Sequence, residues 1–284
     1  MNPAPTLPAS IKLPDPSGSA GLQASPWNNA TAIAGVVIKE LRRRKDFYVL
    51  FVLTALITLV MGSVSIFGED KIVRYLKEVC LFLIWASSLV IAITTTARQI
   101  PTERENRTLF PLLAKPVTRH QLIVGKFLGC WLASGLALLC FYVFFGVMVA
   151  AKEHDLPVLN YFQAMTLHWF ALGIVCAMTM LGSIVFAAPS SNNTILLVVC
   201  TGILLIGRHL HKVALKLSEP VQTVVIAIYY AIPHLELFDV RDLIIHNWGL
   251  IPWPVWLAAL GYAAVYATLF LGLACLVFRR KAVN

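Results

Sequence analysis

Residues 98–126 read RQIPTERENRTLFPLLAKPVTRHQLIVGK. This stretch is the only long, polar and strongly basic passage between two hydrophobic runs that could each cross a bilayer. Connections rich in Lys and Arg are usually retained on the cytoplasmic side of a membrane. The stretch therefore predicts a cytoplasmic connection between two membrane-spanning helices, and it sets the orientation of the chain on either side of it.

Capping signals predict two short helices within this connection. The spacings Thr102 to Glu105 and Thr118 to Gln121 fit the Thr-x-x-Glu/Gln capping box, in which two side chains bond the first free N–H groups of a helix. Pro116 disfavours a helical conformation at the residue before it, so the chain must turn there. We expect the first helix over about 103–114 and the second to lead into the next apolar run.

The connection has two interpretations. Its composition alone fits a solvated link whose basic residues only hold it on the cytoplasmic side. Two capped helices in so short a stretch are more order than a tether needs, and a disordered segment would carry fewer leucines. The second interpretation is therefore an ordered docking element for another protein.

The composition places the chain among polytopic membrane proteins. Of its 284 residues, 58% are hydrophobic and 13% are charged, and the mean hydropathy is +0.77, whereas about a quarter of residues are charged in soluble domains. The net charge of +9 does not indicate a nucleic-acid-binding domain, because the basic residues lie between apolar runs. The six cysteines lie inside hydrophobic runs without a CxxC pair, so we interpret them as packing residues.

Uncharged runs of membrane-crossing length predict an all-α, polytopic membrane fold with six transmembrane helices. The predicted spans are 47–68, 79–97, 127–151, 165–188, 194–216 and 255–278, with the basic connection at 98–126 between the second and third. Residues 69–78 are predicted to be a short charged connection. Residues 156–207 carry no charged side chain, and the polar cluster at 189–193 predicts a tight turn that divides this length into two spans.

The fifth span is assigned from the total number of spans, because an odd or even number decides the side on which the C-terminus lies. Residues 194–207 are short for a crossing, but a chain of five spans would place the basic residues 279–281 outside, against the positive-inside tendency. We therefore extend the span to residue 216 and let its basic side chains reach the interface. His168 and Trp169 are predicted near the outer end of span four, and Trp131, Trp253 and Trp256 at membrane interfaces.

The two ends of the chain and the stretch before the last span are assigned from composition. Residues 1–27, rich in Pro, Ser, Ala and Gly, are predicted to be a disordered tail, and 28–284 a single transmembrane domain. Apolar residues at spacings of three and four before a basic cluster predict an interfacial helix over 28–46. The apolar run 221–232 is too short to cross, and the sequence leaves open whether 220–254 is re-entrant or interfacial.

The distribution of positive charge predicts that both termini are cytoplasmic. With that orientation, fifteen of the 23 Lys and Arg residues lie inside and eight lie outside. Short cytoplasmic connections are enriched in these residues, so the excess supports this topology over its inverse.

The basic stretch also resembles a known family. Its pattern is Glu103-x-x-Asn106-x-Thr108, a Leu112-Leu113 pair, Pro116-Val117-x-Arg119 and then Gly125-Lys126 at the start of a hydrophobic helix. This pattern is similar to the first cytoplasmic loop of ABC-2 type transporter permeases, which carries the coupling helix that contacts the ATPase subunit. The resemblance implies a coupling loop whose docking residues are Glu103, Arg104, Glu105, Arg107, Thr108 and Arg119.

The resemblance implies further properties of the whole chain. The chain would be the permease subunit of an ATP-driven exporter in the cell (inner) membrane, with an interfacial helix before the first span and short extracytoplasmic helices before the last. It would pair with a second permease copy, as a homodimer, and with an ABC ATPase subunit that binds the ATP and Mg²⁺. This chain itself would bind no cofactor, and the sequence does not indicate the transported substrate.

Motifs for catalysis were sought and are absent from the sequence. No Gly-x-x-x-x-Gly-Lys-Ser/Thr, His-Glu-x-x-His or Gly-x-Ser-x-Gly occurs, so neither a P-loop ATPase nor a hydrolase is indicated, and no catalytic residue is assigned. The spacings among His209, His211, His234 and His246 fit no helical metal-ligand pair, so no metal site is assigned. The alternative function, from another class, is a membrane scaffold or maturation factor that transports nothing.

Overall fold

The computed structural model describes residues 26–43, 45–63, 69–106, 118–153, 157–214 and 217–281. Every regular element in these ranges is helical. In chain order the elements are α1 (Pro26–Arg43), α2 (Lys45–Ser63), α3 (Glu69–Ala97), α4 (Pro101–Glu105), α6 (Arg119–Glu153), α7 (Val158–Val185), α8 (Pro189–Ala214), α9 (Val221–Ala231), the 3-10 helix η2 (Leu235–Phe238), α10 (Arg241–Ile245) and α11 (Trp253–Lys281).

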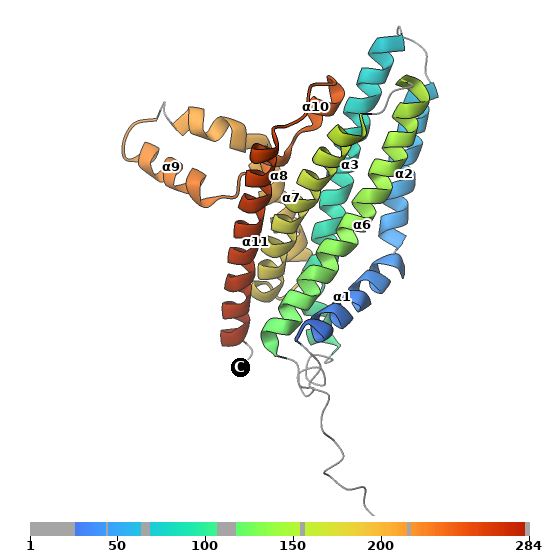
Figure 1. Ribbon diagram of the computed structural model, residues 1–284. Helices are drawn as coiled ribbons and strands as arrows, with labels where there is room; N and C mark the ends of the chain where they lie inside the picture. Colours follow the sequence, from blue (N-terminus) through green and yellow to red (C-terminus); the bar gives the residue numbers. More distant parts are fainter. Residues whose placement is uncertain are drawn as a thin grey trace, which may run out of the picture.

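The long helices α2, α3, α6, α7, α8 and α11 form an elongated bundle (Figure 1). In the part of the chain that the structure describes, five of them, α3, α6, α7, α8 and α11, are long and apolar enough to cross a membrane. The predicted first span corresponds to α2, whose apolar segment is described over Tyr48–Val60. The predicted class, an all-α polytopic membrane protein, is confirmed.

The two ends of the bundle differ in what they carry (Figure 1). One end, here the α4 end, holds α1, α4, the beginning of α6 and the last turns of α11; the guanidinium of Arg119 donates to the carbonyl oxygen of Arg279 there at 3.4 Å. The opposite α10 end holds the beginning of α3, the last turn of α6 and α10. Residues 1–25, assigned to the predicted tail, lie outside the described residues, and α1 begins at Pro26.

Residues 69–78, predicted to be a short charged connection, form the first turns of α3. Lys77 is buried and its ammonium donates to Asn247 Oδ1 at 3.0 Å. Arg74 Nη2 lies 2.9 Å from His246 Nε2. These charges are paired by the segment after α10, so the helix can continue through them.

The turn predicted at 189–193 is displaced toward the N-terminus. The chain turns at Phe186–Ala188, and Pro189 begins α8, a position that suits proline because the first helical N–H needs no partner within the helix. Asn192 is buried, and its Nδ2 donates to the carbonyl oxygen of Thr179 at 3.1 Å. The polar cluster therefore fastens α8 to α7 instead of forming the turn. α8 continues to Ala214, close to the predicted end at 216.

Short helices precede the last span, as predicted. α9 has 11 residues, about 16 Å of helix, which is too short to cross the hydrocarbon core. The segment after α10 is held on α7: Asn160 Nδ2 donates to the Trp248 carbonyl at 2.9 Å, and Gln163 bonds both the N–H and the carbonyl of Ile251, each at 3.0 Å.

Two tryptophans join α6 to α7. The indole N–H of Trp131 donates to the carbonyl of Trp169 at 2.9 Å, and that of Trp169 donates to the carbonyl of Trp131 at 3.0 Å. Their rings stack with centroids 4.8 Å apart. Trp131, predicted to lie at a membrane interface, makes its indole hydrogen bond and its ring contacts within the bundle.

The interfacial-helix prediction corresponds to α1, which crosses the start of α6 (Figure 1). Ala34 and Val37 are buried in this contact. A Cβ at Gly129 would lie 2.7 Å from the Val37 Cβ and 2.9 Å from the Ala34 Cα. The close approach of α1 to α6 therefore depends on the missing side chain at Gly129, as in other membrane helix contacts built on small residues.

We expect Gly129→Leu to separate α1 from α6 and to destabilise the protein by about 1–3 kcal/mol, the usual cost of overpacking. The measurement is thermal unfolding of the purified protein in detergent. Gly272→Leu is the matched control, because a Cβ there meets nothing within 4 Å. Equal melting temperatures for the two variants would contradict the proposed α1–α6 contact.

Candidate functional site

The α4 helix follows α3 after a turn of three residues, 98–100. The N–H of Thr102 bonds the Arg98 carbonyl at 3.1 Å, and the N–H of Arg104 bonds the Ile100 carbonyl at 3.1 Å. Ile100, the residue before α4, has helical dihedral angles of φ −92° and ψ −46°. Backbone bonds of helical spacing therefore persist across the turn and join α4 to the end of α3.

The first predicted capping box is wrong for the same reason. The residue that caps α4 is Ile100, two positions before Thr102, and it makes no side-chain cap bond. Helical geometry is already present when the chain reaches Thr102, so no capping box is needed. The described helix ends at Glu105, and the rest of the predicted helix, from Arg107, lies outside the described residues.

The second predicted capping box is confirmed at the start of α6. The N–H of Thr118 donates to Gln121 Oε1 at 3.0 Å, and the N–H of Gln121 donates to Thr118 Oγ1 at 3.3 Å. This reciprocal pair satisfies two N–H groups that a helix N-terminus leaves without partners. It fixes where α6 begins, and with it the position of every residue in the first turns of that helix.

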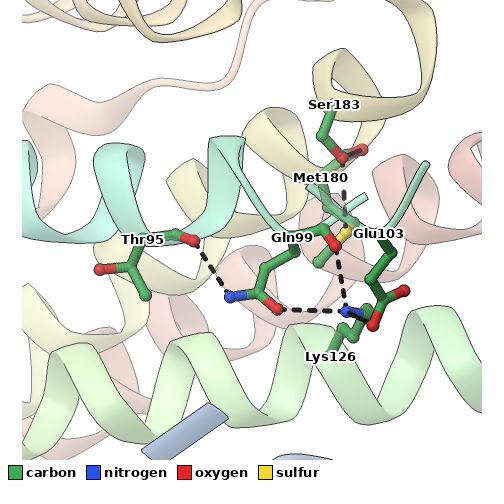
Figure 2. A network of polar contacts seen from close by, with 6 residues as sticks. All are labelled: Thr95, Gln99, Glu103, Lys126, Met180 and Ser183. Atoms are coloured by element: carbon green, nitrogen blue, oxygen red, sulfur yellow. Dashed lines mark hydrogen bonds and ion pairs between the residues drawn. The ribbon is translucent and has the colours of Figure 1, made fainter. Parts of the chain in front are cut away.

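Two turns into α6, a buried lysine joins α6 to α4 and to the end of α3; we call this region, from the end of α3 through α4 to the start of α6, the hinge (Figure 2). The Lys126 side chain is only 5% exposed, and its ammonium lies 2.8 Å from Glu103 Oε1. It also donates to the backbone carbonyl of Gln99 at 3.0 Å and to Gln99 Oε1 at 3.3 Å. We call this set the Lys126 lock; it ties α6 to α4 and to the turn that ends α3.

The acceptors of the lock pair all three N–H donors of the Lys126 ammonium. An ammonium group has three N–H donors, and the three acceptors from Gln99 and Glu103 match that number. The Gln99 amide is itself oriented, since its Nε2 donates to the Thr95 carbonyl at 3.3 Å. A buried charge without such partners is strongly unfavourable, so the three elements are held together by the need to solvate Lys126.

The predicted docking residues divide into separate groups. Glu103 belongs to the lock, and Arg119 lies at the start of α6 against the end of α11. Arg104 is half-buried and Glu105 is exposed on α4. Arg107 and Thr108 lie outside the described residues. Sequence reasoning noted Gly125-Lys126 as a motif without assigning Lys126 a role; a lysine inside the start of an apolar run was the available signal.

One ionisable side chain lies deeper than predicted. His168 was expected near the outer end of its span, but α7 already begins at Val158, and the imidazole is buried inside the bundle. Its Nε2 lies 2.9 Å from Ser88 Oγ, and its ring stacks on Trp85 with centroids 4.3 Å apart. The ring packs α7 against α3, the helix that leads into the hinge.

Comparison with known proteins identifies the family. The sequence matches the family described as ABC-2 family transporter protein over residues 73–283. The chain belongs to the ABC-2 transporter family. No curated protein matches it at a significant level. The matched residues include the hinge from α3 through α4 to α6 and extend to the end of α11, while α1 and α2 precede them.

Membership of the ABC-2 family places the hinge in a functional setting. The chain is a multi-pass membrane protein and a permease subunit of an ABC transporter, and the family implies association with an ABC ATPase subunit. ABC-2 permeases are typically non-enzymatic membrane subunits. Within this permease, the Lys126 lock joins the turn after α3 and α4 to the start of α6.

We expect Glu103→Gln to destabilise the permease by about 1–3 kcal/mol, because the buried Lys126 ammonium then lacks a charged partner. Lys126→Met alone should also destabilise, whereas the double variant should lose less than the sum of the two. The measurement is a double-mutant cycle by thermal unfolding in detergent, with the exposed Glu105→Gln as control. Strict additivity would show that the two side chains do not interact.

Proposed function

We propose that this chain is the permease subunit of an ATP-driven exporter, in which a separate ATPase subunit docks on α4 and its surroundings. The ATPase binds the ATP and Mg²⁺, and this chain converts the movement of the ATPase into movement of its spans. Six spans from each of two permease copies, as a homodimer, form the path. The membrane is the cell (inner) membrane, and the α4 end faces the cytoplasm.

The observation that supports this proposal is the Lys126 lock. α4 is continuous with α3 through backbone bonds, and the lock joins α4 and the end of α3 to α6. A partner that displaces α4 therefore acts on two long helices at once. A connection that only tethered two spans would gain nothing from a buried, fully paired lysine at its base.

The chemistry of the exposed side favours a protein partner. Arg104 and Glu105 are adjacent on α4, and the Glu105 side chain is exposed. Thr118 and His120 are also exposed, at the beginning of α6. Charged groups of both signs on a short ordered element suit a complementary protein surface, where such charges set orientation and partner choice. The lock fixes the backbone of α4 and of the start of α6, while these exposed side chains remain accessible to a partner protein.

The orientation follows from charge and from the direction of the helices. α1 with its basic end, the hinge and the last turns of α11 all lie at the α4 end. Within the described residues, these segments carry ten Lys and Arg residues, at positions 39, 42, 43, 98, 104, 119, 126 and 279–281. The positive-inside tendency therefore supports a cytoplasmic α4 end and cytoplasmic termini.

Charge reversal on exposed α4 is expected to weaken ATPase binding without unfolding the permease. The variant is Glu105→Lys, and the measurement is co-purification of a co-expressed ABC ATPase together with ATP-dependent transport. We expect at least a tenfold loss of association, because a like-charge contact replaces a complementary one in the interface. Asp242→Lys, an equally exposed reversal at the α10 end, is the matched control and should leave association unchanged.

Unchanged association and transport in Glu105→Lys would contradict docking on this face of α4. A protein that never associates with an ATPase and transports nothing would instead favour the scaffold function. The thermal stability of the variant, measured in parallel, separates a docking defect from a folding defect.

Labelling of two introduced cysteines tests the orientation. His120→Cys and Lys152→Cys place thiols at exposed positions near opposite ends of α6, a helix about 50 Å long. In intact cells, a membrane-impermeant maleimide should label residue 152 and not 120; in inverted vesicles the pattern should reverse. The parent protein, without an introduced cysteine, sets the background. The opposite pattern would reject the proposed topology.

A further inference from the structure

A groove runs along the outside of the bundle between α6 and α7, which lie side by side (Figure 1). Its volume is about 380 Å³, and all ten residues that line it are apolar or aromatic. α6 contributes a row from Leu139 to Ala150 at spacings of three and four, which form one face of that helix. α7 contributes a shorter row from Val158 to Met165.

The groove has a buried floor and exposed rims. Tyr142 and Tyr161 are each only 7% exposed and line the floor. The rim side chains are between 47% and 66% exposed; they are Val143, Val147, Val158 and Phe162. Whatever surrounds the bundle at this place therefore has direct access to the groove.

The groove lies within the membrane and covers the depth of one leaflet. Its row on α6 is about 16 Å long, and α6 is long and apolar enough to cross a membrane. The hydrocarbon core is about 30 Å thick, so one leaflet contributes about 15 Å. The row occupies the half of α6 nearer to the α10 end. The groove therefore extends from about the middle of the membrane to the edge of the hydrocarbon at that end.

An empty groove at this depth would be unfavourable. Lipid tails are as apolar as these side chains, so the hydrophobic effect does not drive α6 and α7 to close over the groove. Side chains that border an empty space lose their dispersion contacts on that side. A flexible alkyl chain restores these contacts, because it can follow an irregular surface.

We propose that the groove binds one acyl chain of a phospholipid from the leaflet at the α10 end. The chain lies along α6, with its methyl end near Leu139 and Met165 and its carboxyl end near Ala150 and Val158. Three observations support this occupant: the apolar lining, the exposed rims and a length that matches one leaflet. The headgroup lies outside the groove, because no lining residue is charged.

Other occupants fit the groove less well. A charged compound would lose its hydration there without gaining a charged partner. A helix of a second copy is about 10 Å across, so a segment about 16 Å long fills on the order of 1,200 Å³, about three times the volume of the groove. The proposal goes beyond the exporter function, because the groove lies at the other end of α6 from the hinge and binding there requires no ATPase.

Photolabelling of the full-length permease in detergent tests the proposal. The probe is a phosphatidylcholine with a diazirine at the methyl end of one acyl chain, added at one molar equivalent, and peptide mass spectrometry locates the label. Detergent dilutes lipids that only surround the protein, so we expect label at Leu139 and Met165 well above that at Leu269, which is exposed on α11. A diazirine beside the carboxyl group should move the label to Ala150 and Val158.

Variants that fill the groove should exclude the chain. Gly146→Leu should lower the labelling at Leu139 about tenfold or more, because the added side chain occupies the space of the ligand. Ala150→Leu fills the groove nearer to the α10 end and should give the same loss, so the test does not depend on one variant. Gly261→Leu is the matched control, because a Cβ there meets nothing within 4 Å, and it should leave the labelling unchanged.

Two results would overturn the proposal. The first is equal labelling of the groove in the wild type and in both filling variants, with melting temperatures that show all three proteins to be folded. The second concerns a second copy as the occupant: Val147→Cys would then form covalent dimers with a bifunctional maleimide, above the background of the parent protein, and the lipid probe would not label the groove. Label in the groove without such dimers supports the acyl chain.

Discussion

The rest of the hinge depends on one constraint: the Lys126 ammonium is buried at the base of α6 and must be solvated by protein. Its three donors meet the Gln99 carbonyl, the Gln99 side chain and the Glu103 carboxylate. Since a buried unpaired charge is strongly unfavourable, these acceptors cannot separate from α6 without another source of solvation. A single side chain therefore determines how α3, α4 and α6 meet.

Contacts gather around the first turns of α6 as a result. α1 packs on α6 at Gly129, three residues after the lysine, and Arg119 reaches the end of α11. Farther along, the Trp131 and Trp169 pair joins α6 to α7. The lock thus joins α4 to the part of α6 that also contacts α1 and α11. This arrangement suits a coupling element better than a flexible linker.

The sequence predicted what depends on local pattern. Apolar runs located the long helices, and the Thr118 and Gln121 box, whose partners are three residues apart, was confirmed. The sequence-based prediction failed where contacts between residues far apart in the chain determine the structure. Lys77 continues α3 instead of ending it because Asn247, 170 positions away, accepts its hydrogen bond. The prediction that Thr102 caps a helix failed for a local reason, because the preceding turn is already helical. The lock needed the three-dimensional pairing of Gln99 and Lys126, and the pattern alone does not contain it.

Two buried ionisable side chains, Lys126 and Glu236, differ in how completely the surrounding protein pairs them. At Lys126 every donor has an acceptor within the protein, so the group serves to hold helices together. At Glu236 one oxygen is paired with His234, and the other packs against Gly207 of α8 without a hydrogen-bond partner among the described residues. Burial without pairing is unfavourable for the free protein. The same physical rule therefore makes Lys126 a lock and leaves Glu236 only partly paired.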